Sequence, residues 1–213
     1  MSLTFYYGSG SPYAWKVWLS LEHKKLAYEW KLLSFDRGDT RADEFLALNP
    51  RGKVPVLDHD GLALAESNAI VEYLEERFPE HPLLPRDPAA RAKARQFSAE
   101  ADSYIAPVQR RLFQETLFTK EADRDATKIA EAHAAVLEEL ARWEAQLTGD
   151  WLLGELSLAD FAVYPHIRAI RRVDDRLPTL GLGDRWPARI TAWMKRVEEL
   201  PYYDKTIPPH WKG

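Results

Sequence analysis

The chain contains no cysteine among its 213 residues. It therefore has no disulfide bonds, no thiolate ligands for a metal and no cysteine nucleophile. If thiol chemistry takes place here, the sulfur must arrive on a ligand. The six histidines also lack the spacing of a metal site, so the sequence predicts no bound metal.

Surplus positive charge and long apolar runs are missing as well. The 29 Lys and Arg residues face 33 Asp and Glu, which gives a net charge of -4 and no general attraction to nucleic acid or anionic membranes. No segment is apolar for long enough to cross a bilayer, and the N-terminal sequence MSLTFYYGSG does not resemble a signal peptide. We therefore expect a cytoplasmic protein that binds neither nucleic acid nor membrane.

The apolar content of 46% is enough to build one large domain or two small ones. Up to residue 79 the periodicity alternates between that of strands and that of helices. The expected strands lie at 3–7, 28–33, 54–57 and 62–64, and the expected helices start near 13, 42 and 67. The first strand, helix and second strand form a βαβ unit, which implies a parallel pair. Asp60-Gly61 predicts a hairpin between the last two strands.

Residues 80–88 have the composition of a linker, because three prolines there interrupt any helix or strand. From residue 89 to residue 213 the periodicity is helical throughout. One helix is expected over 89–120, with a kink at Pro107, and another begins at a capping box formed by Ser157 and Asp160. The predicted architecture is an α/β domain (1–79), a linker (80–88) and an all-α domain (89–213).

Ser11 is the first candidate for chemistry, because it lies between the first strand and the first helix. Serine before proline is a common helix N-cap, and capping alone accounts for Ser11. Gly8 and Gly10, however, allow a sharp turn that leaves room for a ligand. The hydroxyl and the helix N-terminus would stabilise an anion there, including a ligand thiolate.

Val54-Pro55 is the second candidate. A proline within a strand lies at an edge or follows a cis peptide bond. An edge strand is one interpretation, and the other is that the Val54 backbone pairs with a peptide-like ligand. The residues alone leave both open.

Glu66-Ser67 is the third candidate. Ser67 is expected to cap the following helix, which is a structural role. The same helix N-terminus would also bind a ligand carboxylate, while Glu66 would accept an ammonium group. Together these groups suit the head of an α-amino acid.

Four segments resemble serine-type cytosolic glutathione transferases, and they occur in the order found in that family. They are Ser11-Pro12 with Trp15-Lys16-Val17, residues 49–57 (NPRGKVPVL), residues 66–70 (ESNAI) and residues 156–161 (LSLADF). The resemblance covers nearly the whole chain and does not assign a class. It implies a thioredoxin-like N-terminal domain, a helical C-terminal domain and a homodimer.

The resemblance also implies which group activates the thiol of bound glutathione. Ser11 would donate a hydrogen bond to the sulfur. Ser9, on the same turn, and Tyr7, at the end of the first strand, are alternatives.

For the rest of glutathione, the resemblance implies contacts from two loops and one helix. Val54 would pair with the cysteinyl backbone beside cis-Pro55, Glu66 and Ser67 would hold the γ-glutamyl end, and Lys53 would meet the glycyl carboxylate. Asp102 would reach the glutathione of the partner subunit.

The implied activity is transfer of glutathione to a small hydrophobic electrophile. Residues expected to line the electrophile pocket are Tyr7, Tyr104, Arg111 and Trp211. Two alternatives are a glutathione-dependent disulfide reductase or isomerase, and a non-catalytic binding module that keeps the transferase fold.

Overall fold

The computed structural model describes residues 2–212, and contacts divide the chain into two units. The first unit runs to Leu83 and also includes the tail from Pro201 onward, while the second spans Leu84–Leu200. The tail thus differs from the sequence-based expectation, which placed everything after residue 88 in the helical domain. It packs on the first unit through α9 (Tyr203–Thr206), where Thr206 Oγ1 accepts a 2.9 Å hydrogen bond from Trp15 Nε1.

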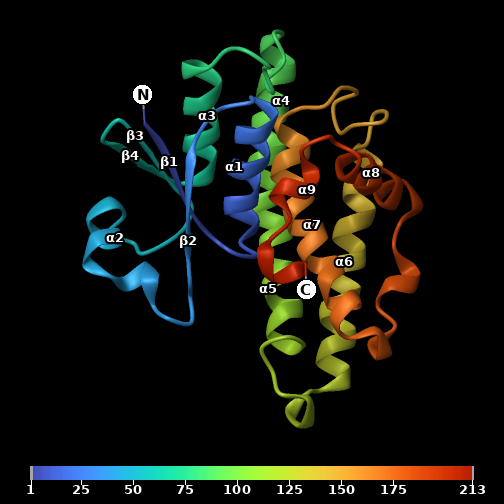
Figure 1. The fold of residues 1–213 in the computed structure, drawn as a ribbon. Coiled ribbons are helices and arrows are strands. Elements are labelled where there is room, and N and C mark those ends of the chain that lie inside the picture. The colour runs from blue at the N-terminus through green and yellow to red at the C-terminus, as the bar shows by residue number, and fades with distance from the viewer. Residues whose placement is uncertain (1, 213) are drawn as a thin grey trace. The chain divides into compact units, whose positions relative to one another are not determined.

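A four-stranded mixed sheet lies at the centre of the first unit (Figure 1). Its strands are β1 (Leu3–Gly8), β2 (Glu29–Leu33), β3 (Val56–His59) and β4 (Leu62–Ala65). They are arranged in the order β2-β1-β3-β4, with β1 parallel to β2 and β3 antiparallel to both its neighbours. The predicted βαβ unit and the hairpin are confirmed.

The position of Pro55 excludes a plain edge strand, which was one of the two interpretations of Val54-Pro55. β3 lies inside the sheet between β1 and β4, and Pro55 comes immediately before it. The Val54–Pro55 peptide bond is cis. Because Pro55 stands outside the ladder, its missing N–H removes no hydrogen bond from the sheet.

Helices cover both faces of this sheet. α1 (Pro12–His23) and α3 (Ser67–Arg77) lie against one face, and α2 (Asp43–Leu48) lies on the other (Figure 1). All eight residues from Ala14 to Leu21 are buried, so α1 packs on every side rather than along one stripe.

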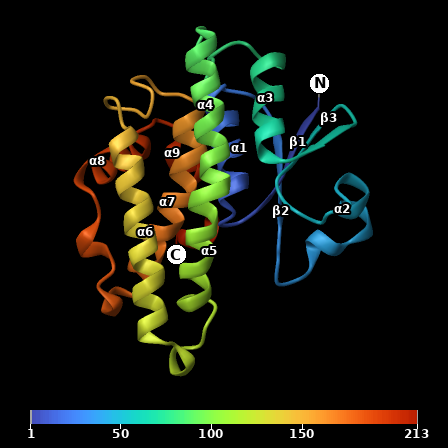
Figure 2. The ribbon, with the colours of Figure 1, turned by 180° about the vertical axis from the view of Figure 1, so that it is seen from behind.

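The second unit consists of helices (Figure 2). They are α4 (Pro88–Glu100), α5 (Ala106–Glu115), α6 (Ala126–Gln146), α7 (Leu158–Arg176) and α8 (Ala188–Glu198). The helix expected over 89–120 is interrupted by a π-helical turn at Ala101–Ile105, just before Pro107. Such a turn accommodates a proline that cannot donate to the preceding helix.

The predicted capping box at the start of α7 is confirmed. Asp160 is fully buried, and its carboxylate accepts hydrogen bonds from the Ser157 backbone, from Leu152 N at 3.0 Å and from Trp193 Nε1 at 2.8 Å. Burial raises the pKa of this carboxyl group, and the hydrogen bonds oppose that effect. Among residues 2–212, none of the helices combines the length and apolarity that crossing a membrane requires.

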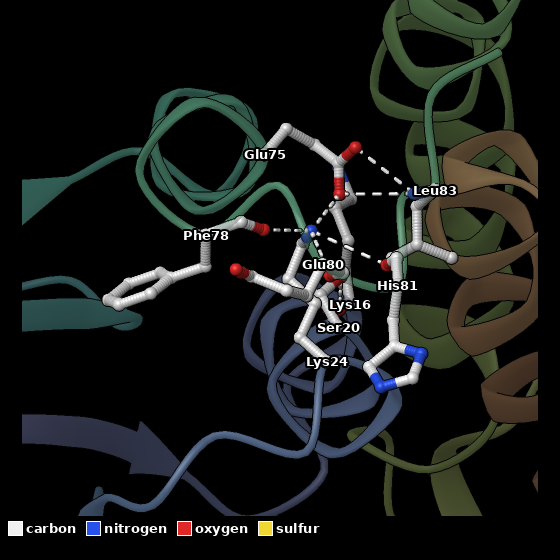
Figure 3. A network of polar contacts seen from close by, with 8 residues as sticks. All are labelled: Lys16, Ser20, Lys24, Glu75, Phe78, Glu80, His81 and Leu83. Atoms are coloured by element: carbon white, nitrogen blue, oxygen red, sulfur yellow. Dashed lines mark hydrogen bonds and ion pairs between the residues drawn. The ribbon is translucent and has the colours of Figure 1, made fainter.

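A buried ion pair fixes the chain where it leaves α3 (Figure 3). Lys24, 4% exposed, places its Nζ 2.7 Å from Glu75 Oε1 and donates to the carbonyl of Phe78 at 2.8 Å. The Glu75 carboxylate accepts the backbone N–H of Leu83 at 3.0 and 3.2 Å. Lys24 and Glu75 together therefore join the end of α1, the end of α3 and the segment that follows.

Replacing Lys24 by methionine tests this pair. Lys24→Met removes the cation that lies 2.7 Å from the buried Glu75 carboxylate, so we expect the free energy of unfolding to fall by about 3–5 kcal/mol. Arg142→Met is the matched control, because it breaks an exposed ion pair with Glu138 and should cost less than about 0.5 kcal/mol. Urea denaturation of both variants measures the difference, and equal small losses would contradict the structural role of Lys24.

A second prediction concerns the contact between α1 and the tail. His23 Nδ1 lies 2.8 Å from the Tyr202 hydroxyl, and burial, aided by the nearby Lys24, His81 and Lys25, lowers the pKa of His23 to about 4. In the unfolded chain this pKa is about 6.5. Between these values the unfolded state binds more protons, so stability falls as the pH drops from 6.5 towards 4.

With partial solvent exposure taken into account, the loss due to His23 should be about 1–2 kcal/mol. His23→Asn keeps a polar partner for Tyr202 but does not titrate in this range. Denaturation curves at several pH values should therefore show a shallower acid decline for the variant. Identical declines would show that His23 is not held neutral.

Candidate functional site

The register of the sheet brings the three candidate segments to one end of it. Tyr6 pairs with Val56, and Val56 pairs with Ala65, so these three residues form one row across β1, β3 and β4. The chain leaves β1 two residues after this row, enters β3 from Val54-Pro55 directly before it, and leaves β4 at Glu66 directly after it. α1 and α3 both begin here, so two helix N-termini lie at the same end of the sheet.

Ser11 is the N-cap of α1, as its structural interpretation predicts. Its Oγ accepts a 3.3 Å hydrogen bond from Ala14 N, and its own N–H donates to Gly8 O at 3.1 Å to close the turn. The capping bond uses the oxygen of the hydroxyl and not its hydrogen. Ser11 is partly exposed, so capping and hydrogen-bond donation to a ligand are compatible.

Tyr7 lies in the core of the first unit and not on its surface. Its side chain is 2% exposed and its ring packs against Phe5, Trp18 and Trp30. Burial raises the pKa of the Tyr7 hydroxyl to about 12. Tyr7 therefore presents almost no surface to a ligand, which argues against both the roles expected for it, as an activator and as a pocket wall.

Ser9 contacts the C-terminal tail. Its Oγ lies 2.5 Å from His210 Nδ1, and Trp211 Nε1 donates to the other ring nitrogen of His210 at 2.9 Å. The Trp211 ring stands edge-on to Trp15 of α1, with 5.2 Å between the centroids.

The loop before Pro55 is organised by Asn49, a residue with no role of its own among the sequence-based predictions. Asn49 is 5% exposed, donates from Nδ2 to Lys53 O at 2.7 Å and accepts from Arg51 N at 3.1 Å. These bonds fix the backbone next to Val54, which is half-buried, and leave the Lys53 side chain exposed. The signal for this role was Asn49 itself, since asparagine side chains often bond to the backbone of their own turn.

Glu66, and not Ser67, occupies the N-cap position of α3, so the expectation that Ser67 caps this helix is wrong. Ser67 is the first helical residue and is 5% exposed. Glu66 adopts φ 66°, a left-handed conformation that costs a non-glycine residue about 1–2 kcal/mol, and its side chain makes no capping bond. An exposed carboxylate is therefore held at the helix N-terminus at a conformational cost.

Lys16 connects the two helices of the site. Its side chain is fully buried, and Nζ donates a 2.7 Å hydrogen bond to Asn68 Oδ1 in the first turn of α3. In the sequence, Lys16 was singled out only as part of the motif Trp15-Lys16-Val17. A lysine within a run of buried residues was the available signal, because buried lysines are nearly always paired.

The remaining candidates lie partly in the second unit. Asp102 belongs to the π-helical turn, with Oδ1 3.7 Å from the buried His166 Nε2. Tyr104 is 59% exposed, and Arg111 donates to Glu131 at 2.7 Å. Trp211 belongs to the first unit. In the part of the chain from 2 to 212, no group of three or more His, Cys, Asp or Glu residues is placed to hold a metal ion.

Comparison with known proteins identifies the family these features belong to. One family model, described as Glutathione S-transferase, N-terminal domain, matches residues 10–77, and another, Glutathione S-transferase, C-terminal domain, matches residues 102–201. Glutathione S-transferase A of Pleuronectes platessa is 32% identical, with 98% of this chain and 92% of that protein covered.

Two further relatives are informative. Maleylacetoacetate isomerase of Pseudomonas aeruginosa is 36% identical and covers 94% of this chain and 90% of its own length. A crystal structure of a glutathione transferase from Burkholderia graminis, with two glutathione molecules bound per subunit, has a TM-score of 0.84 at 27% identity. It covers 100% of this chain and 90% of its own.

The turn that carries Ser11 yields a prediction of its own. Gly10 and Gly38 both have positive φ, 83° and 74°, but a Cβ on Gly10 would come within 2.9 Å of His210 Cε1, while Gly38 faces open space. Gly38→Ala should cost about 1 kcal/mol from the backbone alone. Gly10→Ala should cost about 2–3 kcal/mol, because it must also displace His210.

Urea denaturation of the two alanine variants measures this difference. Equal losses would mean that the tail does not approach Gly10 in solution.

Proposed function

Because the chain belongs to the glutathione S-transferase family, we propose that it binds glutathione at the end of the sheet where α1 and α3 begin. There it would activate the glutathione thiol for attack on a small hydrophobic electrophile. The observation that carries this proposal is the row of Tyr6, Val56 and Ala65 across three strands. This row brings the three candidate segments, at Ser11, Val54-Pro55 and Glu66-Ser67, to one end of the sheet. A tripeptide with a thiol in its middle residue requires such a set.

Ser11 is the proposed activating group. Its hydroxyl donates a hydrogen bond to the sulfur while its oxygen still accepts from Ala14. A neutral hydrogen bond next to a helix N-terminus favours the thiolate by about 1–3 kcal/mol. This lowers the pKa of the thiol by about one to two units from a reference near 8.5, which makes thiolate abundant near neutral pH.

The other groups on the sheet end hold the rest of the molecule. The Val54 backbone pairs with the cysteinyl residue, and the loop that Asn49 fixes presents Lys53 to the glycyl carboxylate. The α-carboxylate of the γ-glutamyl residue binds at the N-terminus of α3 beside Ser67, and Glu66 accepts its ammonium group. The left-handed conformation of Glu66 suits this role, because strained residues cluster at ligand sites.

We also propose roles for residues outside these three segments. We propose Tyr104, Arg111 and Trp211 as contacts for the electrophile, and Asp102 as a contact to the glutathione of a partner subunit in a homodimer. The chain carries no excess of positive charge, and we place the enzyme in the cytoplasm without nucleic-acid or membrane partners.

Isomerisation of a substrate is the second candidate function, and the relationship to maleylacetoacetate isomerase supports it. The same thiolate would add to an electrophilic carbon–carbon double bond and leave again after rotation, so that glutathione is regenerated. Product analysis separates the candidates: conjugation consumes glutathione in a one-to-one ratio, whereas isomerisation leaves its concentration unchanged.

The roles of Ser11 and Glu66 are tested by separating turnover from affinity. Ser11→Ala should lower kcat with a halogenated aromatic about 10- to 100-fold with little change in glutathione affinity, because it removes a contact to the reacting sulfur. Glu66→Ala should weaken glutathione binding about 10-fold with a smaller effect on kcat. Steady-state kinetics and calorimetric titration give both quantities.

Tyr7→Phe is the matched control for Ser11→Ala, since it removes a hydroxyl that lies in the core. Its kcat should stay within about threefold of the wild type. The assignment of Ser11 would be wrong if Tyr7→Phe lost more turnover than Ser11→Ala.

A further inference from the structure

The C-terminal tail contacts the turn that carries Ser11. The 3-10 helix Pro209–Trp211 places His210 against this turn, with Nδ1 2.5 Å from Ser9 Oγ. The ring also lies so close to Gly10 that a Cβ there would come within 2.9 Å of His210 Cε1. Both contacts are within the first unit.

The hydrogen bonds determine which nitrogen of the neutral ring carries the proton. An indole N–H only donates, so His210 Nε2, 2.9 Å from Trp211 Nε1, must be the acceptor and carries no hydrogen. The proton of the neutral imidazole is therefore on Nδ1, which donates to Ser9 Oγ. As the acceptor in this bond, Ser9 has its own hydroxyl hydrogen directed away from the ring.

The C-terminal tail is held on α1 by contacts with Trp15, so it can fix the position of the turn Gly8–Ser11. The Trp211 ring packs edge-on against Trp15, and Trp15 Nε1 donates to Thr206 Oγ1. Trp15 is 2% exposed and lies in the first turns of α1, four residues after Ser11. His210 is therefore held in place relative to the helix whose N-terminus Ser11 caps.

The turn requires such a support. Glycine stands on both sides of Ser9, and glycine has the widest backbone freedom of all residues. Within the turn, one backbone hydrogen bond from Ser11 N to Gly8 O closes the loop, and Gly10 has φ 83°. Small shifts of this loop would move the Ser11 hydroxyl relative to a bound ligand, and an error of about 1 Å can cost up to about 100-fold in rate.

We propose that His210 is a positioning residue for the thiol site, acting through its hydrogen bond to Ser9. The inference rests on the proposed function, because the turn matters for catalysis only if Ser11 contacts the glutathione sulfur. His210 acts on the placement of Ser11 and not on the groups that hold the ends of glutathione. Its loss should therefore reduce turnover more than affinity.

The test is a set of kinetic measurements on His210→Ala, His210→Asn, Ser9→Ala and the double variant Ser9→Ala/His210→Ala. His210→Ala should lower kcat about 5- to 20-fold and leave the KM for glutathione within about twofold. His210→Asn should recover most of this loss, because the asparagine amide nitrogen takes the place of Nδ1 as donor to Ser9. In the Ser9→Ala background the His210→Ala change should cost less than about twofold, since the bond is already gone.

Lys212→Ala is the control in the same tail. Lys212 Nζ donates to Asp204 O at 2.6 Å, within the tail, so this variant should keep kcat within about twofold. Thermal unfolding of every variant shows whether a loss of activity follows a loss of folded protein.

Three results would overturn the inference. They are a His210→Ala variant with wild-type kcat, a His210→Asn variant no better than alanine, and losses in Ser9→Ala and His210→Ala that simply multiply. Failure of the proposed function is recognised separately, since Ser11→Ala would then keep its turnover.

Discussion

Tyr6, Val56 and Ala65 are paired neighbours in one row across β1, β3 and β4, and the site depends on this strand register. Because β3 runs antiparallel to both neighbours, the chain leaves β1 and β4, and enters β3, at the same end of the sheet. Val56 and Leu57 point to opposite faces of the sheet and are both fully buried, so a shift of β3 by one residue would disturb the packing on both faces, and these two residues hold the register in place. The core of the first unit thereby determines which loops meet.

Two helix N-termini at this end give the site its electrostatic character. Each contributes backbone N–H groups and a partial positive charge, and Lys16 bonds one helix to the start of the other. Ser11 lies at the N-terminus of α1, where we propose that the glutathione sulfur binds. Ser67 lies at the N-terminus of α3, where we propose that the α-carboxylate of the γ-glutamyl residue binds. The negative charge of Glu66 stands beside the partial positive charge at the N-terminus of α3. This part of the site therefore suits a zwitterion, such as the head of an α-amino acid, better than a simple anion.

Local sequence patterns were sufficient to predict the order of strands and helices, the hairpin at Asp60-Gly61, the cap at Ser11 and the capping box at Ser157. Each of these depends on neighbouring residues. Features set by tertiary contacts were missed or wrongly predicted. Pro55 lies before an inner strand, Ser67 leaves the capping position to Glu66, Tyr7 is buried among aromatic rings, and the tail packs on α1 instead of joining the helical unit. The positions of Pro55, Tyr7 and the tail depend on residues further along the chain: β1 pairs with β3, Trp18 and Trp30 pack on Tyr7, and Trp15 bonds to Thr206 of the tail. The change of cap from Ser67 to Glu66 is local.

The central claim is that this end of the sheet binds glutathione and stabilises its thiolate. The most direct measurement is a pH titration of the ultraviolet thiolate absorbance of glutathione bound to the wild-type protein. If Ser11 and the N-terminus of α1 stabilise the thiolate, the midpoint will lie about one to two units below the reference thiol pKa of about 8.5. A midpoint equal to that of free glutathione, at a protein concentration that saturates binding, would contradict it.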